Sequence, residues 1–154
     1  RRAVISAAGR PVAPDANRTL RVSFGRVKGY SPREAVVMTP HTTLAGAIAK
    51  HTGVEPFDVP EKVRAAYAKG GAERVPVDFL ADCDTTGGNS GSPVIDGRGR
   101  LVGVNFDRGW ENVANDFGYN PEVARNVTAD VRYLLWLLSE VEGVPELVSE
   151  LTAR

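Results

Sequence analysis

The sequence predicts a mainly β domain that carries short helices and ends in a pair of helices. Glycine and proline, 16 and 10 of the 154 residues, lie mostly in the first two thirds of the chain and divide it into short segments. Such spacing is typical of β-strands joined by turns. Near the C-terminus, apolar residues recur instead at helical spacing. The length fits about one domain with a core of its own.

The first half of the chain predicts two strands and two helices. Residues 19–27 alternate apolar and polar side chains, which is the period of a half-buried strand, and residues 35–38 predict another. Residues 44–50 and 60–69 predict short helices. Pro60 stands near the first turn of the second helix, where a missing N–H breaks no hydrogen bond.

The second half predicts a strand at residues 75–80, then a glycine-rich turn at 85–91, then a hairpin of residues 93–95 and 101–106. A helix follows, with Thr128 as its predicted N-cap and Gly143 just past its end. A last short helix is predicted at 146–151. The first of these helices carries an apolar stripe that predicts core packing, made of Val131, Leu134, Leu135, Leu138 and Val141.

Charge and composition exclude several classes of function. The 19 Lys and Arg balance the 19 Asp and Glu, so no single-sign field exists to hold a nucleic acid. The longest apolar stretch, near residues 134–138, is far shorter than the roughly 20 residues of a membrane span. Cys83 is the single cysteine, and we predict no disulfide, metal site or cofactor. The chain starts without methionine, and we interpret it as part of a longer protein.

The segment TGGNSGSPV, residues 86–94, holds the clearest chemical signal. A phosphate-binding loop would need a lysine and a following helix, whereas a proline and a β-type run follow here. A hydrolase nucleophile elbow needs G-x-S-x-G and a helix, and both are missing. The remaining interpretations are a plain glycine-rich connection and the nucleophile turn of a chymotrypsin-like peptidase. In that turn Ser90 is the nucleophile, and the N–H groups of Gly88 and Ser90 bind the developing oxyanion.

A longer run, TGGNSGSPVIDGRGRLVGVNFDRGWENVANDFGYNPEVARNVTADVRYLL, resembles the C-terminal part of a bacterial dipeptidyl-peptidase family. Members of this family join a chymotrypsin-like double barrel to an inserted helical domain. The runs APDANRTLRVSFGRVKGYSPREAV and TTLAGAIAKHTGVEPFDVP resemble the same family. The resemblance implies that residues 1–127 form the second β-barrel half and that residues 128–154 form C-terminal helices packed on it.

The resemblance also implies roles for individual residues. Ser90 matches the family's nucleophile, with Gly88 as an oxyanion donor. Asp107 matches the acidic residue that binds the free N-terminal amine of a peptide, a charge-assisted contact. Arg108 matches the position where arginine accompanies acidic preference and glycine accompanies apolar preference; its planar fork can hold a carboxylate. Asn105 and Phe106, on the same strand, are predicted to line the substrate cleft.

Other residues compete with this interpretation. Asp84 lies six residues before Ser90, where trypsin-like enzymes place the carboxylate that attracts basic side chains. It therefore predicts either a basic preference or a structural role, capping the turn or pairing with Arg108. His41 and His51 stand in no motif of a catalytic base, and we interpret them as surface or turn residues. The base and its aspartate are expected in the first barrel, outside this sequence.

The sequence thus predicts a serine exopeptidase that releases N-terminal dipeptides, with Asp or Glu as the second residue, through an acyl-enzyme. The 154 residues alone are expected to be inactive. The alternatives are a non-catalytic peptide-binding β-domain, or a serine peptidase of apolar or, through Asp84, basic specificity. The expected partners are peptides with a free N-terminus. Resemblance alone implies export to the periplasm or cell surface, and a homodimer of the whole enzyme.

Overall fold

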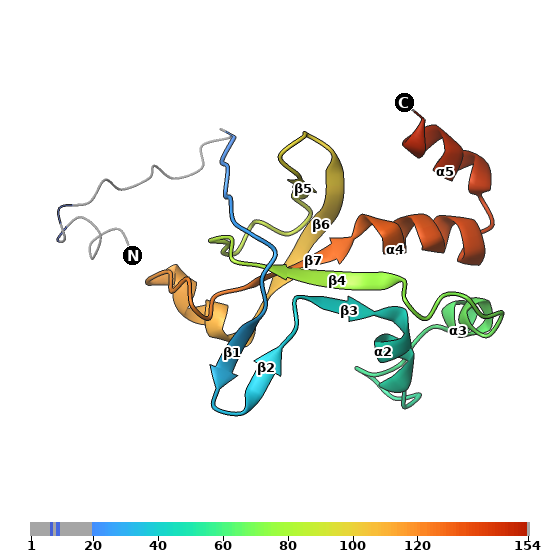
Figure 1. Ribbon diagram of the computed structural model, residues 1–154, viewed down its shortest axis with the longest axis horizontal. Coiled ribbons are helices and arrows are strands. Elements are labelled where there is room, and N and C mark those ends of the chain that lie inside the picture. Colours follow the sequence, from blue (N-terminus) through green and yellow to red (C-terminus); the bar gives the residue numbers. More distant parts are fainter. Residues whose placement is uncertain (1–6, 8, 10–19, 154) are drawn as a thin grey trace.

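The computed structural model of the chain describes Ala7, Gly9 and residues 20–153 (Figure 1). Its main element is a five-stranded antiparallel sheet in the order β3-β4-β7-β6-β5, beside a two-stranded hairpin, β1-β2. The strands are β1 (Tyr30–Arg33), β2 (Val36–Met38), β3 (His41–Thr43), β4 (Pro76–Ala81), β5 (Pro93–Ile95), β6 (Leu101–Arg108) and β7 (Asn126–Asp130). The predicted mainly β class with additional helices is confirmed.

The helices are short, and apart from η1, which the sequence does not predict, they follow the predicted order. They are α2 (Leu44–Ala49), α3 (Glu61–Tyr67), the 3-10 helix η1 (Trp110–Asp116), α4 (Val131–Trp136), the π-helix η2 (Leu137–Val141) and α5 (Pro145–Thr152). The predictions for residues 44–50, 60–69 and 146–151 are therefore confirmed, as are the strands at 35–38, 75–80, 93–95 and 101–106. Within the described part of the chain, no helix combines the length and the apolar character needed to cross a membrane.

The strand predicted at residues 19–27 is wrong over the residues that the structure describes, and Thr19 lies outside them. Only Val27 makes a bridge, to Ala81 at the end of β4. The bridge is antiparallel, so residues 20–26 continue past Ala81, the last residue of β4, and meet no strand there. Their contacts include isolated hydrogen bonds, from the Asp82 N–H to the Arg26 carbonyl at 3.1 Å and from Ser23 Oγ to the Asp84 carbonyl at 3.0 Å. The apolar side chains of the segment consequently face solvent: Leu20 is 91% exposed, Val22 77% and Phe24 88%.

Thr128 is not the helix N-cap that the sequence predicts. It lies in the middle of β7 and is fully buried, while Asp130 caps α4 by accepting a hydrogen bond from the Arg132 backbone N–H at 2.9 Å. The predicted division between residues 127 and 128 therefore falls inside a strand. Polar and apolar side chains alternate along β7, as in an ordinary strand, but here the polar ones are buried: Asn126, Thr128 and Asp130. This inverted pattern explains why β7 escapes prediction.

The apolar core lies at the helical end of the sheet. Leu44 of α2, Val63 of α3 and Ala72 are buried there, and the continuous helix formed by α4 and η2 packs against them through Tyr133, Trp136, Leu137 and Val141. Of the predicted stripe, only Val141 belongs to this packing. The helix switches at Leu137 to wider π turns, with the Glu142 N–H bonded to the Leu137 carbonyl at 2.9 Å, so a strict 3.6-residue period no longer holds.

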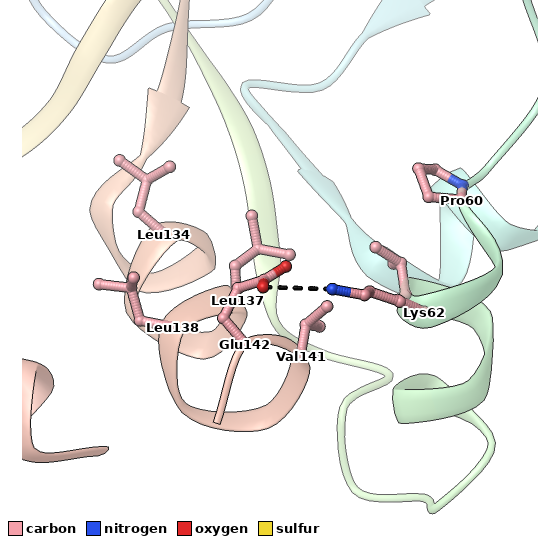
Figure 2. A pocket seen from close by; sticks show the side chains of 8 residues that line it. Pro60, Lys62, Leu134, Leu137, Leu138, Val141 and Glu142 are labelled. Atoms are coloured by element: carbon pink, nitrogen blue, oxygen red, sulfur yellow. Dashed lines mark hydrogen bonds and ion pairs between the residues drawn. The ribbon is translucent and has the colours of Figure 1, made fainter. Parts of the chain in front are cut away.

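Leu134 of α4 and Leu138 of η2, both from the stripe, instead line an apolar groove between α3 and these two helices (Figure 2). The groove has a volume of about 470 Å³ and is also lined by Pro60, Val63, Leu137 and Val141. One ion pair spans it, between the Lys62 ammonium and the Glu142 carboxylate at 3.4 Å. This exposed ion pair links α3 to Glu142, the residue that follows η2, across a groove that is otherwise apolar.

The opposite end of the sheet has a polar interior built around Arg125. Its side chain is fully buried, and its guanidinium donates to the backbone carbonyls of Lys28, Gly29, Pro121, Glu122 and Ala124. The guanidinium also lies 5.4 Å from the ring centre of Tyr30, a cation–π contact. The Tyr30 hydroxyl donates to Glu111 at 2.7 Å, and burial together with this carboxylate raises the pKa of Tyr30 to about 12. Arg125 thereby ties residues 109–125 to the start of β1.

Candidate active site

The turn that carries Ser90 is closed by its own backbone and by Asn89. The Asn89 N–H donates to the Thr86 carbonyl at 3.3 Å, and the Ser92 N–H donates to the Asn89 carbonyl at 3.1 Å. The Asn89 side-chain oxygen accepts from the Thr86 N–H at 3.0 Å. Gly88 has φ +94°, a conformation that favours glycine. The turn is therefore held in one conformation before any substrate is bound.

Asn105 on β6 attaches this turn to the sheet. Its backbone carbonyl accepts from the Gly91 N–H at 2.8 Å, and its own N–H donates to the Ser92 carbonyl at 2.9 Å. Its side-chain Nδ2 donates to the Asn89 carbonyl at 3.2 Å. These contacts place the turn from residue 86 to residue 92 directly beside the strand predicted to bind substrate.

A β-bulge at Phe106 determines which way the end of β6 faces. Asn105 lies opposite Thr128 and Asp107 lies opposite Val127, so Phe106 is an extra residue in the ladder. The bulge changes the alternation of the strand: Asn105 is buried, whereas Phe106 and Asp107 are both exposed. The Phe106 carbonyl accepts a hydrogen bond from Ser90 Oγ at 3.1 Å. The bulge therefore holds the serine hydroxyl at the mouth of the site.

Most of the predicted site residues line one small cavity of about 80 Å³. They are Ser90, Asn105, Phe106, Asp107 and Arg108, together with Thr85, Thr86 and Gly87 of the turn. The backbone N–H groups of Gly88 and Ser90 donate no hydrogen bond to any residue that the structure describes, whereas those of Asn89, Gly91 and Ser92 do. The Gly87 N–H likewise has no partner among the described residues, so three donors of the turn are left for a ligand. Two of them, on Gly88 and Ser90, are the ones that the sequence predicts for an oxyanion, although Gly88 is not among the described residues that line the cavity.

Asp107 and Arg108 offer opposite charges at the edge of this cavity. The Asp107 carboxylate accepts from the Arg108 backbone N–H at 2.8 Å and is otherwise exposed. The Arg108 guanidinium pairs with Asp116 of η1 through its two terminal nitrogens, at 3.3 and 3.4 Å. Asp116 is not among the described residues that line the cavity. Asp116 therefore binds the two terminal nitrogens of the Arg108 guanidinium from outside the cavity. The Arg108 Nε donates no hydrogen bond to any residue that the structure describes.

The competing residues lie elsewhere. Asp84 is not among the described residues that line the cavity; its backbone carbonyl accepts from Ser23 Oγ at 3.0 Å. His41 is on β3, and His51 follows α2, where its Nδ1 accepts the Val59 N–H at 3.0 Å. Burial raises the pKa of the Cys83 thiol, which favours the neutral form. In the described part of the chain, no cluster of His, Cys, Asp and Glu is suited to hold a metal.

The family follows from a comparison with known proteins. The model of the peptidase S46 family matches residues 1–153, which is nearly the whole chain. The chain belongs to the peptidase S46 family. The matched residues include the turn, the bulged strand and the charged pair described above.

Relatives of this S46 chain include two curated proteins named Asp/Glu-specific dipeptidyl-peptidase. The Shewanella putrefaciens protein is 42% identical over 92% of this chain and 23% of its own length; the Capnocytophaga gingivalis protein is 45% identical over 91% of this chain and 21% of its own length. A crystal structure of Porphyromonas endodontalis DPP11 in complex with dipeptide Arg-Asp matches 97% of this chain and 23% of that chain, with TM-score 0.84 and 39% identity. This chain therefore spans about a fifth of these longer proteins.

Sequence reasoning misses several residues of this S46 site. Asn126 and Thr128 lie under the turn but belong to β7, whose inverted alternation hides the strand. Asp116 carries no motif, and only the path of residues 109–125 brings it to Arg108. The one sequence feature that could have revealed β7 is the alternation of polar residues at 126, 128 and 130. This pattern is compatible with a strand whose buried face is polar, but it is equally compatible with a loop.

Proposed function

We propose that this chain carries the nucleophile and the specificity residues of a serine-type dipeptidyl peptidase. The whole enzyme would release N-terminal dipeptides whose second residue is Asp or Glu. One observation carries the proposal: Ser90 and Arg108 line the same small cavity, beside two N–H groups that have no partner among the described residues. The relatives named Asp/Glu-specific dipeptidyl-peptidase support the substrate class.

In the proposed reaction Ser90 Oγ attacks the carbonyl carbon of the second residue. Its proton moves to a base, which then protonates the leaving amine as the C–N bond breaks. Water attacks the resulting ester and frees the dipeptide. The histidine base and its aspartate come from the first barrel, outside these 154 residues, as the family resemblance implies. In the present structure Ser90 Oγ donates to the Phe106 carbonyl, so it rotates toward the base before attack.

The oxyanion of this reaction would be held by the N–H groups of Gly88 and Ser90. Preorganised donors of this kind stabilise charge that appears only in the transition state, and one of them is typically worth about 100-fold to 1,000-fold in rate. The turn is fixed by hydrogen bonds that do not use these two N–H groups. The donors are therefore oriented before the substrate arrives.

Asp107 and Arg108 would define the two ends of the released dipeptide. An exposed carboxylate at Asp107 can bind the substrate ammonium, which makes the enzyme count residues from the free N-terminus. The free Nε edge of Arg108 can bind the acidic side chain of the second residue, while Asp116 holds the other edge. Phe106, 47% exposed, supplies an apolar wall to the cleft. We assign Asp84 a structural role, since it lies outside the cavity lining.

The architecture of the whole enzyme belongs to the same proposal. We propose that the antiparallel sheet is the second barrel of a chymotrypsin-like double barrel, with the helices that begin at Val131 packed on it. The family resemblance supports export to the periplasm or cell surface, and a homodimer. No cofactor is required by the proposed chemistry, and peptides with a free N-terminus are the proposed partners.

The proposal is tested on the full-length protein that contains this chain. Fluorogenic dipeptide substrates with Asp, Glu, Leu or Lys as second residue should show cleavage after Asp and Glu at least about 100-fold faster than after Leu or Lys, because a buried charge pair forms only with the acids. An N-acetylated copy of the Asp substrate is the matched control and should resist cleavage. Preference for Lys would point to Asp84, and no cleavage of any substrate would favour a peptide-binding domain.

The isolated 154-residue chain should have no peptidase activity on the same substrates. Its Ser90 lacks a base, because neither His41 nor His51 is among the described residues that line the cavity. The measurement compares the chain with its Ser90→Ala variant, after circular dichroism has established that both are folded. Cleavage by the chain alone that disappears in the variant would contradict the proposed origin of the base.

A further inference from the structure

Three buried polar side chains lie in a row beneath the Ser90 turn. Asn105 of β6 is 5% exposed, Asn126 of β7 is 2% exposed and Thr128 of β7 is fully buried. Asn126 Nδ2 donates to Asn105 Oδ1 at 2.7 Å and to Thr128 Oγ1 at 3.2 Å. The Asn126 Oδ1 is buried and has no partner among the described residues, so the two bonds of its Nδ2 are what hold this amide, and losing one costs more there than at the surface. The row therefore connects the middle of the sheet to the turn.

The row leaves the Asn105 amide only one orientation. Its Oδ1 accepts from Asn126, so its Nδ2 faces the turn, where it donates to the Asn89 carbonyl at 3.2 Å. A carbonyl is only an acceptor, so the reversed amide would place two acceptors together. Both polar ends of the Asn105 side chain are thus engaged within the protein. This arrangement argues for a structural part in the site instead of the direct substrate contact that the sequence predicts.

The Asn89 carbonyl and the Ser90 N–H belong to one peptide plane. The bond between these residues is trans, so the carbonyl and the N–H point in opposite directions in that plane. A hydrogen bond that fixes the Asn89 carbonyl toward the sheet therefore fixes the Ser90 N–H away from it. That N–H donates to nothing in the described structure, which leaves it for a ligand at Ser90.

We infer that Asn105 is a positioning residue that aims the Ser90 N–H at the oxyanion, and that Asn126 sets the orientation of the Asn105 amide. The inference rests on the proposed function. The backbone bonds of Asn105 to Gly91 and Ser92 do not depend on its side chain. Removal of the side chain therefore leaves the turn attached to β6 and takes from the Asn89 carbonyl one of its two donors; the Ser92 N–H, at 3.1 Å, remains, so the Asn89–Ser90 peptide plane is held less firmly.

The test uses the full-length protein and its preferred dipeptide substrate. Asn105→Ala should lower kcat by about 30-fold to 300-fold, somewhat less than the loss of a whole oxyanion donor, with KM changed by less than about threefold. Asn105→Asp, which keeps the shape but cannot donate to the Asn89 carbonyl when ionised, should lower kcat similarly. Asn126→Ala should lower kcat by about tenfold. Asn112→Ala is the matched control, because it removes a fully buried amide that bonds Arg125 instead of the turn.

A second readout separates positioning from general loosening of the structure. A peptide aldehyde forms a tetrahedral adduct with Ser90 whose oxygen needs the aimed N–H, whereas a dipeptide analogue with hydrogen in place of its terminal carboxylate has no oxygen there and does not need it. Asn105→Ala should weaken aldehyde binding by the same factor as kcat and leave binding of this analogue unchanged. An unchanged kcat in the folded Asn105 variants, or equal loss for aldehyde and analogue, overturns the inference. A wild-type enzyme that cleaves no dipeptide substrate overturns the proposed function, and this inference with it.

Discussion

Replacement of Ser90 by alanine in the full-length enzyme is expected to lower kcat by at least about 10,000-fold. A missing nucleophile removes the covalent route entirely, and what remains comes from substrate binding and the oxyanion donors. The folded state should be nearly unchanged, because Ser90 Oγ is exposed and makes one hydrogen bond, to the Phe106 carbonyl. The measurement is steady-state cleavage of the Asp dipeptide substrate, together with the thermal midpoint of each protein.

Ser92→Ala is the matched control for this result. It removes a second hydroxyl from the same turn, two residues further along, while the backbone bonds of Ser92 to Asn89 and Asn105 remain. We expect kcat to stay within about threefold of wild type, because the hydroxyl of the half-buried Ser92 makes no hydrogen bond to any described residue. If Ser92→Ala is the variant that loses activity and Ser90→Ala retains it, the assignment of the nucleophile is wrong.

Replacement of Arg108 by glycine should reverse the substrate preference. Cleavage after Asp or Glu is expected to fall by about 30-fold to several thousand-fold, which corresponds to the cost of removing one partner of a desolvated charge pair. Cleavage after Leu should rise, because glycine leaves an uncharged space beside the apolar Phe106. The ratio of kcat/KM values for the Asp and Leu substrates measures the change.

The control for Arg108→Gly is Arg98→Gly, which removes an arginine from the turn between β5 and β6 and should leave the ratio unchanged. Arg108 is 25% exposed and bonded to Asp116, so its removal also frees that carboxylate. An Arg108→Gly enzyme that still prefers Asp over Leu by the wild-type ratio would show that another residue reads the acidic side chain.

Local sequence predicts most of the elements, but it misses the strand at the centre of the site. The hairpin of β5 and β6 and the helices α2, α3 and α5 follow from alternation, turn glycines and helical spacing. β7 is missed because its buried residues, Asn126, Thr128 and Asp130, are polar. Conversely, residues 20–26 alternate like a strand but form none, because the antiparallel bridge of Val27 to Ala81 directs them past the end of β4, where no strand lies to pair with them.

The candidate site divides in the same way. The residues of the turn and the charged pair could be named from the sequence, since glycines around a serine and the run NFDRGWE are local features. The bulge at Phe106 could not, although it decides that Asp107 faces solvent while Asn105 faces the interior. Nor could Asp116 be paired with Arg108, because a 3-10 helix anchored by Arg125 brings the two together.

The sequence by itself determined most of the elements, the family resemblance and the candidates for the reacting groups, because these depend on residues that are close along the chain. Only the tertiary structure decided which polar groups are buried and where they point. A buried amide or guanidinium is stable only if partners from other elements satisfy its hydrogen bonds. For Asn105 those partners are Asn89 and Asn126, and for Arg125 they include the carbonyls of Lys28 and Gly29, nearly a hundred residues earlier. These partners are brought together by the packing of elements that are distant in the sequence, and local sequence patterns do not reveal which elements will pack together.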